Sequence, residues 1–358
     1  MPHPARRLLP ALVLLLAATT LALPASARRS PKPTSASIAN PIHEQSFVKI
    51  GGIDQWIAID GINQANPVLL ILHGGPGSTW DPLARLFLGW QQYFTLVQWD
   101  QRGAGRTYGQ NRQDPTPITL DRMVRDGIEV SGYVTQRLHQ PKVILLAHSW
   151  GSLLGVEMAQ LRPDLFLAYV GTGQVVNTQK SEALGYAEVL RRANRAHNPT
   201  AVNDLVTMGP PPYDDVQKLG IERQWEASFA ARSEQKFNSI GFVHTLFPND
   251  FTDKDLADRT AGFFASNYSI YGQKMDGWML SVDLLSIATD FQIPVFFIQG
   301  ELDDITATSL VKEYEHRIKA PRKDLVVLPD DGHLAVMANP DKFLKELRRL
   351  LEPVLKAH

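Results

Sequence analysis

Ser149 stands in a segment that could make its hydroxyl a nucleophile. The run Ala147-His-Ser-Trp-Gly151 follows an apolar stretch and leads into a helical pattern. A serine on a sharp strand-to-helix turn, usually written G-x-S-x-G, is typical of a nucleophile elbow. Small residues are needed two positions before and after the serine, because the two backbones crowd there; here they are Ala147 and Gly151. The alternative is a serine that only caps a buried helix.

A serine hydroxyl becomes a good nucleophile only when a base takes its proton. Of the ten histidines, His333 is placed to do so, because it closely follows the last apolar run of the chain. Asp303 and Asp304 follow the preceding apolar run in the same way. Carboxyl ends of parallel strands meet at one edge of a sheet, so we expect Ser149, His333 and one of these aspartates to converge there. His148 adjoins the nucleophile, and we expect it to pack structurally.

Acyl transfer also needs two backbone amides aimed at the oxygen of the tetrahedral intermediate. The N–H of Trp150 is one candidate, because this residue follows the nucleophile and begins a helix. The second should come from the loop His73-Gly-Gly-Pro-Gly77, whose lack of side chains lets its backbone approach a ligand closely. We predict an oxyanion hole formed by Gly75 and Trp150. An ordinary turn rich in Gly and Pro is the alternative for the loop.

Apolar runs that predict buried strands alternate with helical patterns along the chain. Strands are expected at 67–72, 94–99, 142–147, 167–170, 294–298 and 324–328, after a hairpin formed by 47–50 and 55–59. Helices are expected at 120–139, 152–161, 308–318 and 341–355. This alternation predicts a mostly parallel central sheet flanked by helices, and with the serine elbow it indicates the α/β-hydrolase fold.

The alternation breaks between residues 175 and 286, where helical segments dominate. Since this stretch lies between two predicted core strands, we expect an inserted helical cap domain, or lid. The hydrolase core then consists of two parts, residues 42–174 and 287–358.

The N-terminal residues differ from the rest in composition. Residues 1–27 combine Arg6 and Arg7, an apolar run and an Ala-x-Ala ending, which predicts a secretory signal peptide; an uncleaved membrane anchor is the alternative. Residues 28–41 are rich in Pro and Ser and are expected to form a disordered leader. The sequence therefore predicts an exported protein, periplasmic or secreted, with no stable membrane insertion after signal cleavage.

Composition narrows the function classes. The chain has 358 residues with a formal net charge of −1 and no long run of Lys and Arg, which argues against nucleic-acid binding. It has no cysteine, so a thiol nucleophile, a disulfide and a zinc–cysteine site are excluded. Histidines and carboxylates do not cluster in a ligand pattern, and we predict no metal and no cofactor. The sequence gives no indication of the oligomeric state.

Three motifs together resemble one enzyme family. His73-Gly-Gly-Pro-Gly77, Asp100-Gln-Arg-Gly-Ala-Gly-Arg106 and His148-Ser-Trp-Gly-Ser152 look like those of the proline iminopeptidases, also called prolyl aminopeptidases, within the α/β-hydrolase superfamily. The resemblance extends from about residue 47 to the end and is weakest through the cap. It implies an enzyme that releases the N-terminal residue, preferably proline, of a short peptide through an acyl-enzyme on Ser149. The expected partner is thus a short-peptide or small-molecule substrate. The Gly-x-x-Asp spacing up to Asp303 also resembles the family pattern and favours this residue as the triad acid, with Asp304 as the alternative.

The resemblance further implies a carboxylate that pairs with the substrate amine. Trp225-Glu226 resembles the second half of the family's Trp-x-x-Trp-Glu run, so Glu226 is the candidate, and a solvated helix glutamate is the alternative. The family's second acidic motif, Glu-Asn-His-Tyr-like, has its nearest counterpart in Ala265-Ser-Asn-Tyr268, which lacks the glutamate. The alternative function is therefore an esterase, lactonase or amidase that uses the same triad on a small molecule. A catalytically silent binding protein on this scaffold is a third possibility.

Overall fold

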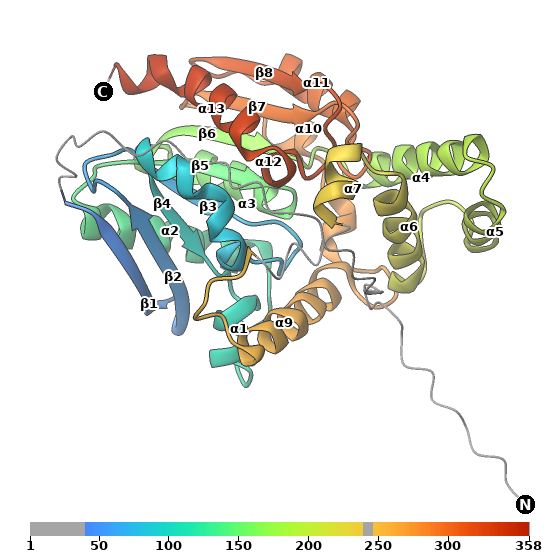
Figure 1. Ribbon diagram of the computed structural model, residues 1–358, viewed down its shortest axis with the longest axis horizontal. Helices are drawn as coiled ribbons and strands as arrows, with labels where there is room; N and C mark the ends of the chain where they lie inside the picture. Colours follow the sequence, from blue (N-terminus) through green and yellow to red (C-terminus); the bar gives the residue numbers. More distant parts are fainter. Residues whose placement is uncertain (1–39, 239–245, 358) are drawn as a thin grey trace, which may run out of the picture. The chain divides into compact units, whose positions relative to one another are not determined.

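A single eight-stranded sheet forms the centre of the folded chain (Figure 1), which a computed structural model describes over residues 40–238 and 246–357. The strand order is β1-β2-β4-β3-β5-β6-β7-β8. β2 is antiparallel to both of its neighbours, β1 and β4; the pairs from β4 to β8 are all parallel. The strands are β1 (Ile42–Ile50), β2 (Ile53–Gly61), β3 (Val68–Leu72), β4 (Thr95–Trp99), β5 (Val143–His148), β6 (Phe166–Thr172), β7 (Val295–Gly300) and β8 (Lys323–Leu328).

The strands agree with those predicted, except that the first hairpin is longer at both ends. Its turn is made by Gly51 and Gly52, both with positive φ, which glycine adopts without steric cost. β1 pairs with β2 over its whole length and lies at the edge of the sheet. Its first half was missed because Glu44, Gln45 and Ser46 are polar and partly exposed, so no apolar alternation marks them.

Helices cover both faces of the sheet, which explains why its inner strands are apolar throughout. In β3, Leu70 and Leu72 pack into one buried cluster, whereas Leu69 and Ile71 pack into another. Successive side chains of a strand point to opposite faces, so both clusters need apolar residues. The helical segments of the core are η1 (Asp81–Gln92), α1 (Gly105–Gln110), α2 (Leu120–Leu138), α3 (Trp150–Leu161), η2 (Pro163–Leu165), α11 (Thr308–Arg317), α12 (Ala335–Ala338) and α13 (Pro340–Leu355).

The predicted cap is present as a set of helices between β6 and β7. They are α4 (Thr178–Arg195), α5 (Pro199–Met208), α6 (Val216–Phe229), α7 (Arg232–Asn238), α9 (Asp253–Tyr271), η3 (Trp278–Ser281) and α10 (Leu284–Ile287). β6 and β7 are adjacent and pair directly, with Tyr169 opposite Val295. The chain thus leaves the sheet at one strand, builds the cap, and returns to the neighbouring strand.

Local sequence fixes where the cap helices begin. Asn177, Asn198 and Asp215 each accept a hydrogen bond from an amide in the first turn of α4, α5 and α6. Thr252 and Asp255 form a reciprocal capping box at the start of α9. Such caps satisfy amides that have no partner inside the helix.

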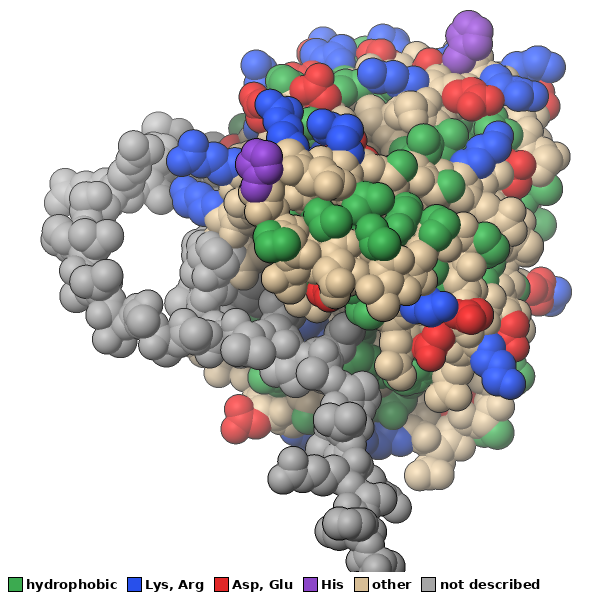
Figure 2. Space-filling model, turned by 90° about the vertical axis from the view of Figure 1, so that its right-hand side faces the viewer, with side chains coloured by type: hydrophobic (Ala, Val, Ile, Leu, Met, Phe, Trp, Pro, Cys, Tyr) green, Lys and Arg blue, Asp and Glu red, His purple; other side chains and the backbone are tan. Residues whose placement is uncertain are grey.

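The cap also has an apolar core of its own. Val189, Leu205 and Leu219, from three different helices, are buried against one another. Figure 2 shows the side of the molecule on which α4, α5 and α6 lie, where hydrophobic side chains gather among charged ones. Leu184 and Val206 are among the exposed apolar residues of the cap, at 45% and 60%.

The signal peptide expected over residues 1–27 lies outside the described residues, as does the leader expected over 28–41 except for its last two positions. Asn40 and Pro41 are exposed and precede β1. Over residues 40–238 and 246–357, none of the helices combines the length and the apolar character needed to cross a membrane.

Candidate active site

Ser149 occupies the sharp turn between β5 and α3. Its backbone has φ 54° and ψ −124°, a conformation that a non-glycine residue rarely adopts and that is typical of functional sites. A Cβ placed on Gly151 would lie 2.2 Å from the carbonyl oxygen of Leu72, so only glycine fits there. A Cβ on Gly155 would lie 3.0 Å from that of Ala147. The crowding predicted around the elbow is therefore present.

The structure brings Ser149, His333 and Asp303 into one hydrogen-bonded chain. The hydroxyl oxygen of Ser149 lies 2.9 Å from Nε2 of His333. Nδ1 of the same ring lies 3.0 Å and 3.1 Å from the two carboxylate oxygens of Asp303. Because a carboxylate only accepts, Nδ1 carries the ring proton and Nε2 offers its lone pair to the serine hydroxyl. The three groups are thus arranged for proton transfer from Ser149 to His333.

Asp303 is buried but well supplied with donors. The side-chain amide of Gln299 donates to it at 2.7 Å, and Thr306 donates from its backbone amide and its hydroxyl at 2.9 Å and 2.8 Å. Burial alone would raise its pKa, but the charge of His333 and these hydrogen bonds outweigh burial, and the pKa of Asp303 is lowered. Burial likewise opposes the charged form of His333, but Asp303 outweighs it, and the pKa of His333 is raised above 6.5.

Asp304 does not contribute to the triad. Its carboxylate forms an ion pair with Arg192 of α4, at 2.8 Å. Burial raises the pKa of Asp304 to about 7. Of the two aspartates left open by the sequence, Asp303 is the one in contact with His333.

His148 is neutral and packed, as expected. Burial lowers its pKa to about 3. Its ring lies between those of Trp80 and His333, at centroid distances of 5.4 Å and 4.9 Å. Its Nε2 lies 3.0 Å from the backbone oxygen of His333, so Nε2 carries the proton and donates it.

The glycine-rich loop after β3 lies against the nucleophile. A Cβ on Gly74 would be 2.9 Å from the Cβ of Ser149, which shows how closely the loop backbone passes. Gly75 has φ +119°, and a side chain there would clash with the amide of Ser78 at 2.6 Å. Trp150 is the first residue of α3, so its N–H has no partner within the helix. These are the two residues predicted to form the oxyanion hole.

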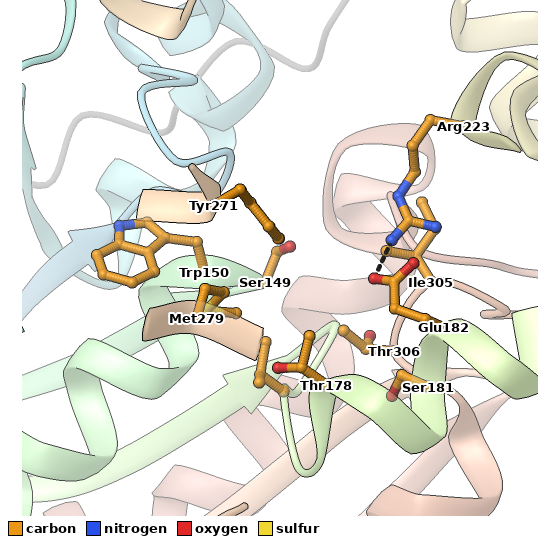
Figure 3. Close-up of a pocket in the computed structure, with 11 residues that line it drawn as sticks. Ser149, Trp150, Thr178, Ser181, Glu182, Arg223, Tyr271, Met279, Ile305 and Thr306 are labelled. Atoms are coloured by element: carbon orange, nitrogen blue, oxygen red, sulfur yellow. Dashed lines mark hydrogen bonds and ion pairs between the residues drawn. The ribbon is translucent and has the colours of Figure 1, made fainter. Parts of the chain in front are cut away.

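A small recess leads to Ser149 (Figure 3). In Figure 3, Ser149 and Trp150 lie on one side, and Glu182 and Arg223 on the other. Its walls are partly apolar and come from both the core and the cap. The lining residues are Ser149, Trp150, Val175, Thr178, Ser181, Glu182, Arg223, Tyr271, Met279, Ile305 and Thr306.

Three buried glutamates surround Arg223 in the cap. The guanidinium donates to Glu182 at 2.5 Å and to Glu226 at 2.7 Å, while Tyr213 donates to Glu222 at 2.5 Å. Burial raises the pKa of Glu182 and raises that of Glu222 to about 8. One carboxylate oxygen of each glutamate accepts no hydrogen bond from the described residues. This wall thus combines one guanidinium with three glutamates and keeps unused acceptor oxygens.

Glu226 and Glu182 hold different places in this wall. Glu226 is buried, with 5% of its surface exposed, so the solvated-glutamate alternative is wrong. It reaches the recess only through Arg223, because Glu182 and Arg223 are lining residues and Glu226 is not. The sequence prediction missed Glu182. The helical spacing of Thr178, Glu182 and Gly185 could have indicated that Glu182 lies on the buried face of α4.

The segment Ala265–Tyr268 supports the glycine-rich loop instead of supplying an acid. The side-chain amide of Asn267 donates to the carbonyl of Pro76 at 2.9 Å. Tyr268 is 40% exposed, whereas Tyr271, one turn further, lines the recess. Burial raises the pKa of Tyr271 to about 12.

Metal-ligating side chains do not gather anywhere in the described part of the chain. No group of three His, Cys, Asp or Glu residues in residues 40–238 and 246–357 has the geometry to hold a metal ion. The side chains around Ser149 are those of acyl transfer, which needs a nucleophile, a base and an oxyanion site.

Comparison with known proteins shows the family to which the chain belongs. The profile of the alpha/beta hydrolase fold family matches residues 67–340. The chain is 28% identical over 305 residues to a probable aminopeptidase, YbaC, of Bacillus subtilis. The aligned region covers 84% of this chain and 94% of the relative. It is 23% identical over 326 residues to a proline iminopeptidase of Saccharolobus solfataricus, covering 87% and 93% of the two chains. A proline iminopeptidase-related protein from Thermus thermophilus has the same fold, with a TM-score of 0.63 and 20% identity over 88% of this chain and all of that one.

Proposed function

Since the chain belongs to the alpha/beta hydrolase fold family and is a hydrolase, we propose that it is an exported serine aminopeptidase resembling proline iminopeptidase. The observation that carries the proposal is a recess with Ser149 on one side and Glu182 on the other. The first supplies a nucleophile for a scissile carbonyl. The second offers an acceptor to a free amine bound in the same recess.

The reaction would follow from the hydrogen-bonded chain. His333 takes the proton of Ser149 as the serine oxygen attacks the carbonyl carbon, and Asp303 stabilises the resulting imidazolium. The amides of Gly75 and Trp150 would receive the negative oxygen of the tetrahedral intermediate. His333 then gives its proton to the leaving amine, and the C–N bond breaks to leave an acyl-enzyme. A water molecule, deprotonated by His333, releases the acyl group as a free amino acid.

Substrate recognition would rest on the acidic wall. A substrate's N-terminal ammonium has up to three donors and a positive charge, and the wall has free carboxylate oxygens on Glu182 and, behind it, on Glu226. Arg223 holds both glutamates in place through ion pairs. A bound ammonium would donate to the acceptor oxygens that Arg223 leaves unused.

The apolar part of the recess suits a small ring. Val175, Met279 and Ile305 line it beside the polar residues, as does the ring of Tyr271. Proline, whose ring is apolar and whose nitrogen becomes a secondary ammonium at a peptide N-terminus, meets both demands. The names of the relatives, an aminopeptidase and a proline iminopeptidase, agree with this choice.

A substrate comparison on the wild-type enzyme tests the proposal. Prolyl p-nitroanilide should be cleaved efficiently, and its N-acetyl derivative at least about 100-fold less so, since loss of a charge-assisted contact costs about 1.5–3 kcal/mol and the acetyl group also fills the amine site. Cleavage of p-nitrophenyl acetate without any cleavage of prolyl substrates would instead support the second candidate, an esterase, lactonase or amidase. The observation that favours the second candidate is the missing glutamate near Asn267.

Export is a separate part of the proposal and rests on the N-terminal pattern alone. Expression of the full chain with a C-terminal tag in a bacterial host should yield a mature periplasmic or secreted protein that begins at residue 28. Full-length protein retained in the membrane fraction would indicate an uncleaved anchor.

A further inference from the structure

The peptide group that follows the catalytic histidine is held from two sides. Its carbonyl, that of His333, accepts a hydrogen bond from Nε2 of His148 at 3.0 Å. Its amide, that of Leu334, donates to the carboxylate of Glu234 at 2.5 Å. One anchor comes from the nucleophile elbow and the other from helix α7 of the cap.

Glu234 reaches this peptide because Gly332 has no side chain to block it. It is only 4% exposed, and its carboxylate lies against Gly332, where an added Cβ would be 2.8 Å away. The neighbouring Ser233 donates to Asp331 at 3.1 Å, a second link between α7 and the same loop. The cap thus contacts the histidine loop through two consecutive residues.

These contacts bear on the reaction through the orientation of the imidazole. Nε2 and Nδ1 of His333 must face Ser149 and Asp303 at the same time. Rotation of the peptide after His333 would carry its Cα, and hence its ring, away from that alignment. A misplacement of about 1 Å is enough to cost a reaction on the order of 100-fold.

We propose that Glu234 is a positioning residue, which fixes the catalytic histidine from the cap by accepting the hydrogen bond of the Leu334 amide. The inference rests on the proposed role of His333 as the base and extends it to the cap. The cap then does more than bind substrate, because its helix α7 completes the geometry of the triad.

The charge of Glu234 adds a second effect. Burial raises the pKa of Glu234 to about 7, and its carboxylate in turn helps to raise the pKa of His333. The other charged groups around them are Asp303, which raises the pKa of His333, Arg223, which lowers it, and Asp331, which is paired with Lys342. Loss of the Glu234 charge should therefore move the ionisation of His333 to lower pH.

Two variants and one control test the proposal, with the rate of fluorophosphonate labelling of Ser149 as readout. Labelling depends on the activated serine and not on amine recognition. Glu234→Ala should lower the labelling rate and kcat by about 10- to 100-fold, with KM for prolyl p-nitroanilide within about threefold of wild type. Glu234→Gln keeps an acceptor oxygen, so it should recover most of the rate while its acidic limb shifts to lower pH. Gln235→Ala, on the same helix but at an exposed side chain that donates to the backbone oxygens of Ser228 and Ala230, should label at the wild-type rate.

Wild-type labelling by Glu234→Ala would overturn the proposal. So would an equal loss in Glu234→Gln and Glu234→Ala without a change in the pH profile, which would indicate a purely structural role. Ser149→Ala separates this test from the proposed function. If that variant still labels and turns over substrate, the serine mechanism fails; if it is silent while Glu234→Ala is fully active, only the present inference fails.

Discussion

The polar groups at the carboxyl ends of the parallel strands, called the sheet edge below, differ from those in the wall of the cap. At the sheet edge, Asp303 receives hydrogen bonds from three residues, and both ring nitrogens of His333 have partners. In the cap wall, Glu182, Glu222 and Glu226 each retain a buried oxygen with no donor among the described residues. Leaving a buried acceptor unpaired costs about 1–3 kcal/mol of stability. The wall therefore destabilises the empty protein until a substrate supplies the missing donor.

The contrast separates the reaction from its substrate. A fully bonded triad is preorganised and should act on any carbonyl that reaches Ser149. An acidic wall with open acceptors should discriminate among substrates by their free amine. Changes at the sheet edge should therefore lower activity on all substrates, and changes in the wall on amine substrates alone.

The largest effect is expected for Ser149→Ala. Without the hydroxyl no acyl-enzyme forms, so kcat should fall by at least about 10⁴-fold for both prolyl p-nitroanilide and p-nitrophenyl acetate. Steady-state assays of the two substrates measure this directly. Loss of one activity with the other intact would place the second reaction elsewhere in the molecule.

Asp303→Asn and Asp304→Asn form a matched pair at adjacent positions. Asp303→Asn should reduce kcat by about 10³- to 10⁴-fold, because an amide no longer selects the Nδ1–H tautomer of His333. Its acidic limb should also shift downward, since Asp303 raises the pKa of His333 and the wild-type base is neutral only above that pKa. Asp304→Asn removes only the pair with Arg192 and should change kcat by less than about threefold. Equal losses in the two variants would contradict the assignment of the triad acid.

Glu182→Gln tests the wall. Removal of the charge that faces the recess should lower kcat/KM for prolyl p-nitroanilide by about 10- to 100-fold, the range of a charge-assisted hydrogen bond. The rate on p-nitrophenyl acetate should stay within about twofold, because that substrate has no amine. Glu226→Gln, one step behind Arg223, should show the same selectivity with a smaller loss. A fall in both substrates would mean that Glu182 supports the triad and not the amine.

The last effect concerns stability and not the rate of reaction. The pKa of Glu222 is raised to about 8, above its ordinary value of 4.5, so the folded state keeps a proton that the unfolded chain releases between these values. Stability should thus fall as pH rises through this window, by at most about 1.4 kcal/mol per pH unit from this group. Glu222→Gln should flatten the decline of Tm between about pH 5 and pH 8, whereas Glu188→Gln, at a residue whose pKa is about 2, should leave the slope unchanged.

The sequence predicted the sheet edge far better than the cap. The strand pattern and three glycine-containing motifs located Ser149, His333 and the loop around Gly75, because close backbone packing permits few residue types at those positions. The Gly-x-x-Asp spacing favoured Asp303 and kept Asp304 as the alternative; in the structure Asp303 contacts His333, and the adjacent Asp304 points to Arg192. Glu182 was missed because its neighbours in the wall come from α6, and contacts between separate helices leave no fixed spacing along the chain.

The adjacency of β6 and β7 has a consequence for how such enzymes diversify. Because these neighbouring strands pair with each other directly, everything between them can be exchanged without changing the register of the sheet. A foreign insert whose two ends lie one strand spacing apart could be grafted at this junction onto an unchanged catalytic scaffold. In this protein, however, such a transplant would need its own counterpart of the anchor at the histidine loop, which is a criterion for choosing donors.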